Sequence, residues 1–119
     1  GRPNFHISLI VDVSPNCDCH AENDIPIIPN VGMLASFDPV ALDQACADLC
    51  NQMKPIPESV LGQNMKSSTA CDHEHGHDCD HEEHNDVFTM THPDTEWTSC
   101  IEHAVKIGLG TNEYELHTI

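Results

Sequence analysis

Two cysteines and a histidine lie within four residues of one another, as Cys17, Cys19 and His20. Pro15 and Asn16 stand just before them and favour a turn. Thiolate and imidazole are the donors that zinc takes from proteins, and thiolates hold iron–sulfur clusters. We therefore expect this turn to carry a metal site, with the two thiolates as its anchoring ligands.

Further donors in two predicted helices could complete the coordination. Four-coordinate zinc needs a tetrahedron of Cys or His, so each helix would supply one group. The expected ligands are Cys17, Cys19, His20, Cys46, Cys100 and His103. The cofactor would be zinc or an iron–sulfur cluster. A reduced cysteine among apolar helix residues also behaves as a small buried hydrophobe, so this alternative stays open for the helical thiols.

A second possible metal site lies in a low-complexity insert at about residues 71–86. The segment holds five histidines, two cysteines and seven acids, with no base. Imidazole suits zinc, nickel, copper and cobalt, so another divalent transition metal is possible here. Without a metal we expect the insert to be disordered. Its candidate ligands are Cys71, His73, His75, His77, Cys79, His81 and His84.

An enzyme is a further hypothesis, because a Cys–His pair can serve nucleophilic catalysis. Cys19 and His20 are adjacent, however, and neighbouring residues of an extended chain point to opposite sides. Four carboxylates near predicted strand ends or helix starts are weaker candidates, namely Asp12, Asp24, Asp38 and Asp43. Asp38 is more simply a helix cap. The sequence contains no Gly-rich phosphate loop, nucleophile elbow or His-Glu-x-x-His motif.

The composition restricts the partners. A formal net charge of −16 would repel nucleic acid and anionic lipid, so neither is expected to bind. No apolar run is long enough to span a membrane. Seven cysteines cannot all pair internally, and no signal-peptide pattern is present, so we expect reduced thiols in a cytoplasm.

Two segments have the pattern of strands that could position the Cys17–His20 turn. Residues 5–13 alternate, and the alternation places Phe5, Ile7, Leu9, Val11 and Val13 on one face, expected to pack on a core. Ile10 on the other face indicates that both sides of the strand are partly covered. Residues 33–36 form a short candidate strand after a Pro-broken apolar loop. Residues 112–119 alternate again and predict a final strand.

Two helices are predicted. The first begins at Asp38-Pro39, a cap followed by a favourable first residue, and ends before Pro55. The second follows a cap at Asp94 or Thr95 and closes at Gly108. Residues 58–70 have weak periodicity and predict a loop. Together these elements predict an α/β fold, a small mixed sheet with two main helices.

Four segments together resemble the family called domain of unknown function 362. They are residues 11–20, 22–36, 38–49 and 97–110. The resemblance implies a bacterial or archaeal α/β domain, often joined to ferredoxin-type iron–sulfur modules, and it assigns no catalytic residue. On this basis residues 1–119 would be one α/β domain, the C-terminal part of a larger one.

The resulting hypothesis is a metal-binding module of a redox-associated protein, with ferredoxin-type modules or electron-transfer proteins as partners. One alternative is a metal store or chaperone that acts through the His-rich insert. Another is an enzyme that uses the Cys17–His20 loop with a substrate bound by a missing N-terminal half.

Overall fold

The fold combines a small sheet with four helices. The computed structural model describes residues 3–69 and 86–119. In chain order the elements are β1 (His6–Ile10), β2 (Gly32–Ser36), α1 (Pro39–Gln52), α2 (Val60–Thr69), α3 (Val87–Thr91) and α4 (Thr98–Lys106). The predicted α/β class is confirmed. The sheet is antiparallel and has two strands in the described residues.

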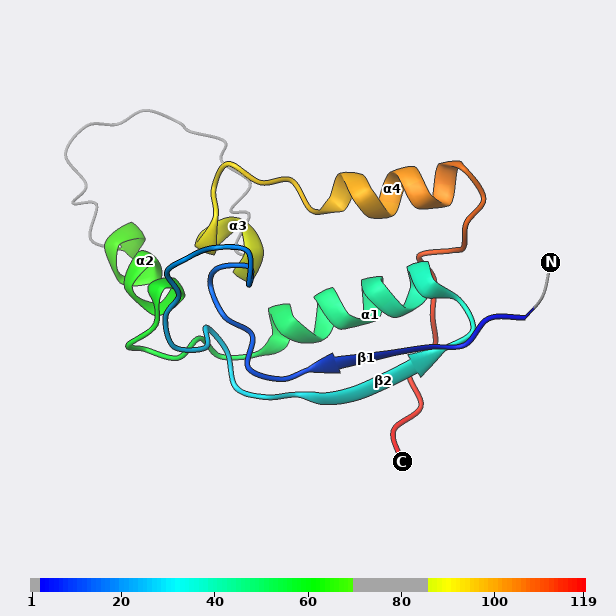
Figure 1. Ribbon diagram of the computed structural model, residues 1–119, viewed down its shortest axis with the longest axis horizontal. Coiled ribbons are helices and arrows are strands. Elements are labelled where there is room, and N and C mark those ends of the chain that lie inside the picture. The colour runs from blue at the N-terminus through cyan, green and yellow to red at the C-terminus, as the bar shows by residue number, and fades with distance from the viewer. Residues whose placement is uncertain (1–2, 70–85) are drawn as a thin grey trace.

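Helix α1 is the central layer. It contacts both strands on one side and α4 on the other, while α2 and α3 pack together at one end (Figure 1). The strands pair so that Ile7 lies opposite Ala35 and Leu9 opposite Met33. Because α1 is covered on two sides, it supplies many of the buried apolar side chains, from Val40 to Cys50.

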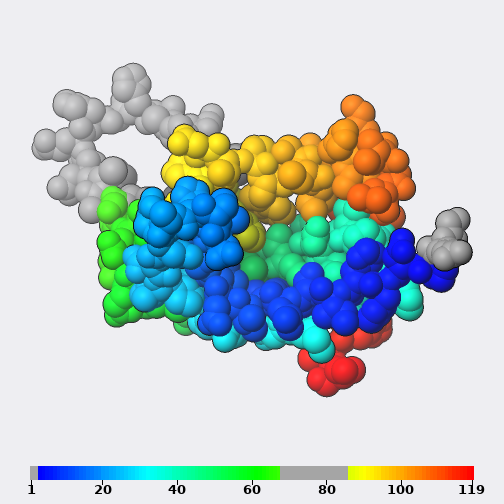
Figure 2. All heavy atoms as spheres, viewed as in Figure 1, coloured from blue at the N-terminus to red at the C-terminus, as the bar shows by residue number. Residues whose placement is uncertain are grey.

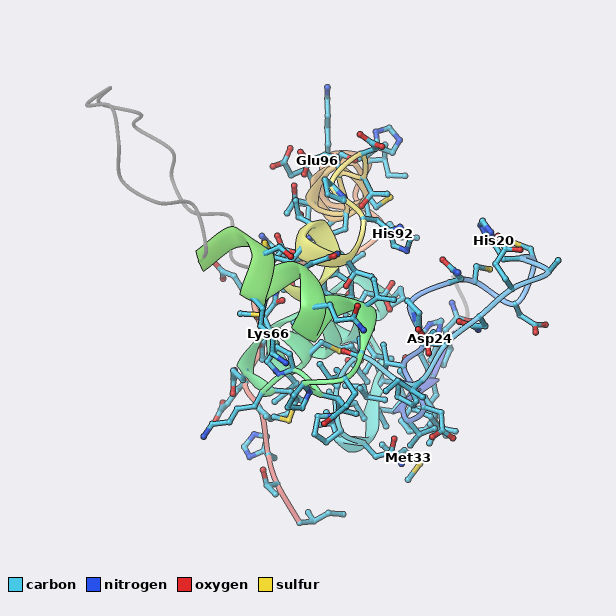
Figure 3. The ribbon with its side chains drawn as sticks, turned by 90° about the vertical axis from the view of Figure 1, so that its left-hand side faces the viewer. His20, Asp24, Met33, Lys66, His92 and Glu96 are labelled. Atoms are coloured by element: carbon cyan, nitrogen blue, oxygen red, sulfur yellow. The ribbon has the colours of Figure 1, made fainter. Side chains whose placement is uncertain are left out.

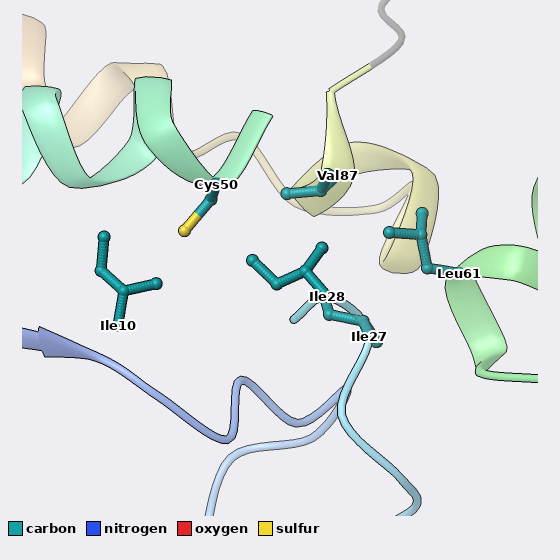
Figure 4. Packing of buried hydrophobic residues seen from close by; sticks show 6 residues of the cluster. All are labelled: Ile10, Ile27, Ile28, Cys50, Leu61 and Val87. Carbon is teal, nitrogen blue, oxygen red and sulfur yellow. The ribbon is translucent and has the colours of Figure 1, made fainter. Parts of the chain in front are cut away.

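The apolar core joins α1 to the segments around it. Figure 4 shows its buried members, which are Ile10, Ile27, Ile28, Cys50, Leu61 and Val87. Ile27 and Ile28 come from the Pro-broken loop, and the Ile27 carbonyl accepts a hydrogen bond from Ile56 N at 2.9 Å. Burying an aliphatic side chain contributes about 2 kcal/mol, so this loop is a structural part of the core.

Asp38 fixes the start of α1 as predicted. Its Oδ1 accepts hydrogen bonds from Val40 N at 2.9 Å and Ala41 N at 3.1 Å. Pro39 occupies the first turn. The other carboxylate oxygen accepts a bond from Thr111 N at 2.9 Å, so one side chain both caps the helix and holds the C-terminal segment. A Cβ at Gly110 would lie 2.1 Å from Asp38 Oδ1, which explains the glycine there.

The predicted final strand at residues 112–119 is wrong. This segment has no regular secondary structure and runs beside β2 and α1. Tyr114 donates a hydrogen bond of 2.6 Å to Asp48 Oδ2, and this bond raises the pKa of Tyr114 to about 12. Residues 112–119 are therefore attached to α1 through a side chain and do not pair as a strand.

The predicted burial of the Phe5, Ile7, Leu9 and Val11 face of β1 is wrong, whereas the predicted cover over Ile10 is confirmed. Phe5, Ile7, Leu9 and Val11 are exposed, and the opposite face, with Ser8 and Ile10, meets α1. Alternation shows that a strand has an apolar face, but it does not show what covers that face. In the described residues no helix or strand packs on it, and the C-terminal segment borders it where Met33 and Ala35 line a shared cavity.

The helix predictions need two corrections. The loop predicted for residues 58–70 is mainly helix α2, and Ser59 Oγ caps this helix by accepting a hydrogen bond from Gly62 N at 3.2 Å. The cap of α4 is neither Asp94 nor Thr95, because the helix begins at Thr98. Its predicted end is confirmed, since Gly108 has a φ of 73°.

The His-rich insert lies outside the described residues, except for Asp86. That carboxylate caps α3 through Phe88 N and Thr89 N, and it accepts a bond of 3.2 Å from Trp97 Nε1. None of the helices in the described part of the chain has the length and apolar character to cross a membrane.

We predict that Asp38→Ala lowers the free energy of unfolding by about 1–2 kcal/mol, because the helix loses its cap. The Ala41 N–H, followed by the Thr111 N–H, lowers the pKa of the Asp38 carboxyl. Its stabilisation is therefore present above the ordinary Asp pKa and disappears as the pH falls through the lowered value. Urea unfolding at several pH values measures both effects.

The matched control is Asp43→Ala, which removes an exposed carboxylate from the same helix. It should change the unfolding free energy by less than about 0.5 kcal/mol. Equal losses in the two variants would contradict the role given to Asp38.

Candidate functional site: a dithiol loop between the strands

Residues 12–30 form a long excursion between the two strands. Its base is closed by Val31 N donating to Ile10 O at 2.9 Å and Ile27 N donating to Val13 O at 2.8 Å. Asp12 has a φ of 49°, a left-handed conformation that Asp tolerates better than most residues, and its N–H donates to Asn30 Oδ1 at 2.7 Å. The loop therefore leaves and re-enters the fold at a fixed point.

Two asparagines close the inner part of the loop. Asn16 N donates to Asn23 Oδ1, and Asn23 Nδ2 donates back to Asn16 O, both at 3.3 Å. Asn16 Nδ2 also donates to Glu22 O at 3.3 Å. We call residues 16–23 the dithiol loop, because this clasp encloses Cys17 and Cys19.

The two thiols of the dithiol loop interact directly. Both are exposed, and they share a side-chain hydrogen bond. The Cys19 N–H, followed by the Cys19 thiol, lowers the pKa of the Cys17 thiol. The pKa of the Cys19 thiol is raised, because its proton is held by the Cys17 sulfur. Cys17 is therefore the thiol that ionises first.

His20 completes the turn through its backbone, since its N–H donates to Cys17 O at 2.9 Å. Figure 3 shows its side chain at the tip of the loop, which projects from the body of the protein. Within the described residues, its ring forms no hydrogen bond with either thiol. The hypothesis of a catalytic Cys–His pair therefore has no thiol–imidazole contact to support it.

The cysteines of α1 lie elsewhere. The Cys50 sulfur points into the apolar core, and burial raises the pKa of this thiol (Figure 4). Cys46 is partly buried and interacts with the Ser8 side chain on β1; its pKa is also raised, mainly by burial. This arrangement matches the alternative in which a helical cysteine acts as a small hydrophobe.

Cys100 and His103 are exposed on α4, which has no buried residue. In residues 3–69 and 86–119, no three His, Cys, Asp or Glu side chains gather as a metal ion would require. The expected set of Cys17, Cys19, His20, Cys46, Cys100 and His103 is thus not assembled as one cluster. What the fold does bring together is the Cys17–Cys19 pair. The second possible set, in the insert, lies outside the described residues.

His92 is a residue whose role the sequence did not indicate. Its Nε2 is hydrogen-bonded to Pro15 O, so the end of α3 holds the start of the dithiol loop. The two residues are 77 positions apart in the chain. The asparagine clasp was likewise not predicted, although asparagine is a common side-chain partner of loop backbone.

The chain also has a cavity of about 320 Å³ beneath the C-terminal segment. Its lining is mainly apolar and comes from β2, α1 and residues 114–119, including Leu34, Leu42 and Leu116. The C-terminal segment lies toward the end of the sheet away from the loop that joins the strands (Figure 1). None of the expected metal ligands lines the cavity.

Fold and site together define a small α/β domain whose strands are joined by an exposed dithiol loop. The model of the family described as Domain of unknown function (DUF362) matches residues 2–48. This match confirms the resemblance for β1, the dithiol loop, β2 and most of α1, which are DUF362-like. Residues 97–110 lie outside it. No curated protein and no solved structure matches the chain.

We predict that a thiol reagent such as iodoacetamide modifies Cys17 before Cys19 as the pH is raised, because the reacting species is the thiolate. Cys19→Ala removes the thiol donor and should slow modification of Cys17 at a fixed pH below the ordinary thiol pKa. Peptide mapping by mass spectrometry measures the rate at each cysteine.

Cys100 provides a matched reference in the same protein, because it is exposed but has no thiol partner in the described residues. Its rate should not change in Cys19→Ala. If Cys17 reacts at the same rate in both proteins, the shared hydrogen bond does not control its ionisation.

Proposed function

We propose that the protein is a metal-binding module of a redox-associated protein, and that Cys17 and Cys19 are its protein thiolate ligands. The observation that carries the proposal is the contact between two exposed thiols on a loop fixed at both ends. A pair of adjacent sulfurs can bind one soft or borderline cation in a bidentate manner, and metal binding requires the thiolate form.

The remaining cysteines support this choice by contrast. Cys50 is enclosed by core side chains, so a metal ion could reach it only if the core opened. Cys46 contacts Ser8 beneath α1, and Cys100 stands on a different helix. Cys17 and Cys19 combine exposure with a second thiol at hand, which makes them the favoured pair.

The proposed site is open. Two thiolates, with His20 next to Cys19 in the sequence as a third candidate, leave at least one position of a tetrahedral zinc ion for another ligand. Zinc is favoured over an iron–sulfur cluster, because a cluster is usually held by four cysteine thiolates. The free position would accept a ligand from a partner protein, such as the ferredoxin-type module expected from the family resemblance, or from a small molecule.

Metal analysis of the full chain tests the proposal. Protein produced without added metal and purified without oxygen is compared with Cys17→Ser/Cys19→Ser. We expect the variant to lose one equivalent of bound zinc, or its high-affinity binding in a zinc titration. Cys46→Ser and Cys100→Ser are the matched controls and should retain it. Equal metal content in the double variant and the wild type would reject the proposal.

The His-rich insert is a second candidate, as a metal store or chaperone. The observation that favours it is the structure of its flanks. Helices α2 and α3 pack against each other, and Asn64 Nδ2 donates to Met90 O at 2.9 Å. Val87 N donates to Asn51 Oδ1 at 2.9 Å. Because these contacts hold both flanks to the domain, a variant in which residues 71–85 are replaced keeps the described core side chains.

The same titration distinguishes the two candidates. Replacing residues 71–85 by a Gly/Ser linker of equal length should remove any weaker, pH-sensitive sites and leave the site that depends on Cys17 and Cys19. A protonated histidine no longer binds a metal ion, so the amount of metal bound by the insert should decrease at low pH. Loss of all metal binding in the linker variant would instead assign the function to the insert.

A further inference from the structure

One face of the β1–β2 sheet is apolar and has no helix packed on it in residues 3–69 and 86–119. Its residues lie opposite each other in register, Ile7 with Ala35 and Leu9 with Met33. Phe5 and Phe37 extend the face, with ring centroids 5.2 Å apart. We call the exposed side chains of Phe5, Ile7, Leu9, Met33, Ala35 and Phe37 the open face. Contiguous apolar patches of this kind mark interaction sites on soluble domains.

The open face is distinct from the packed face of the same sheet. Ile10 belongs to the core and Ser8 contacts Cys46 of α1, so α1 covers the other side. Figure 2 shows β1, in dark blue, lying along the surface without a layer over it. The sheet is therefore a middle layer with a covering helix on one side only, among the residues that the structure describes.

The dimensions of the open face fit a helix. Each strand has five residues and is about 17 Å long, and two strands about 4.8 Å apart give a strip roughly as wide as a helix. A helix of about 12 residues is about 18 Å long and about 10 Å across. Helix α1, with 14 residues, already covers the opposite side of the sheet in this way.

The negative charge around the open face favours an apolar partner that is also basic. Residues 3–53 contain no Lys or Arg, and the whole chain has a formal net charge of −16. Asp12 lies two residues beyond the end of β1, and Glu115 lines the same cavity as Met33 of β2. Asp24 and Met33 lie toward the same side of the molecule in Figure 3. A second copy would bring two strongly acidic surfaces together, whereas a basic partner would be attracted.

We propose that the open face binds an amphipathic helix of a partner protein, whose apolar stripe is flanked by Lys and Arg. The apolar side chains would supply most of the affinity, and the acidic surroundings would set the orientation and the rate of association. The proposal is independent of metal binding, because the open face contains no thiol or imidazole.

The test uses the full chain and two synthetic helical peptides, both with Leu at helical spacing, one with Lys and the other with Glu on the polar face. Fluorescence anisotropy at physiological salt measures binding. We expect the Lys peptide to bind and the Glu peptide to bind at least about tenfold more weakly, because the surroundings of the open face are acidic.

The chain offers a closely matched pair of variants. Ile7→Ser/Leu9→Ser removes two side chains from the open face, with exposed fractions of 58% and 65%. Ile107→Ser/Leu109→Ser removes the same residue types elsewhere, at 62% and 59%. The first should weaken Lys-peptide binding at least about tenfold, and the second should leave it unchanged. If Ile7→Ser/Leu9→Ser fails to fold, Met33→Ser on β2 takes its place and should also weaken binding of the Lys peptide.

Three outcomes would overturn the proposal. Equal binding to both double variants would show that charge alone attracts the peptide. Equal binding of the Lys and Glu peptides would show that the acidic residues around the open face do not select a basic partner. Concentration-dependent dimerisation in sedimentation that disappears in Ile7→Ser/Leu9→Ser would assign the face to a second copy of the chain.

Discussion

The position of helix α1 is the constraint on which the rest of the structure depends. The helix lies between the sheet and α4, and its buried side chains contact both the strands and the apolar core. Asp38 sets the residue at which it begins and also binds Thr111, while Asp48 near its other end binds Tyr114. The C-terminal segment is thus held to α1 at two points, by the carboxylate of the cap Asp38 and by that of Asp48.

The core that α1 organises also fixes the dithiol loop. Ile10 precedes the excursion of residues 12–30 that carries the dithiol loop, Ile27 and Ile28 lie in its returning part, and all three are buried in that core. His92 holds Pro15 from the side of α3. A loop tethered at both ends by buried residues has little freedom to move its inner turn, which keeps Cys17 close to Cys19. The binding of a metal to such a pair would require little reordering of the chain.

Local signals in the sequence predicted α1 and both strands, because Asp38-Pro39 is a strong helix start and alternation is a local property of strands. They failed where the outcome depends on packing. The apolar side of β1 is exposed because no helix or strand in the described residues packs on it, and alternation carries no information about the covering layer. Helix α2 was missed because its cap, Ser59, follows two prolines in a segment of weak periodicity. The pairing of Cys17 with Cys19 follows from their spacing, but the positions of Cys46 and Cys100 depend on how α1 and α4 pack, which spacing does not specify.

X-ray absorption at the zinc edge of the full chain, reconstituted with one equivalent of zinc without oxygen, tests the metal proposal most directly. The account predicts two sulfur ligands at about 2.3 Å, with the remaining ligands being nitrogen or oxygen. Substituting serine for both Cys17 and Cys19 should remove the sulfur contribution. A spectrum with no sulfur ligand in the unaltered protein, or an unchanged sulfur contribution after the substitution, would contradict it.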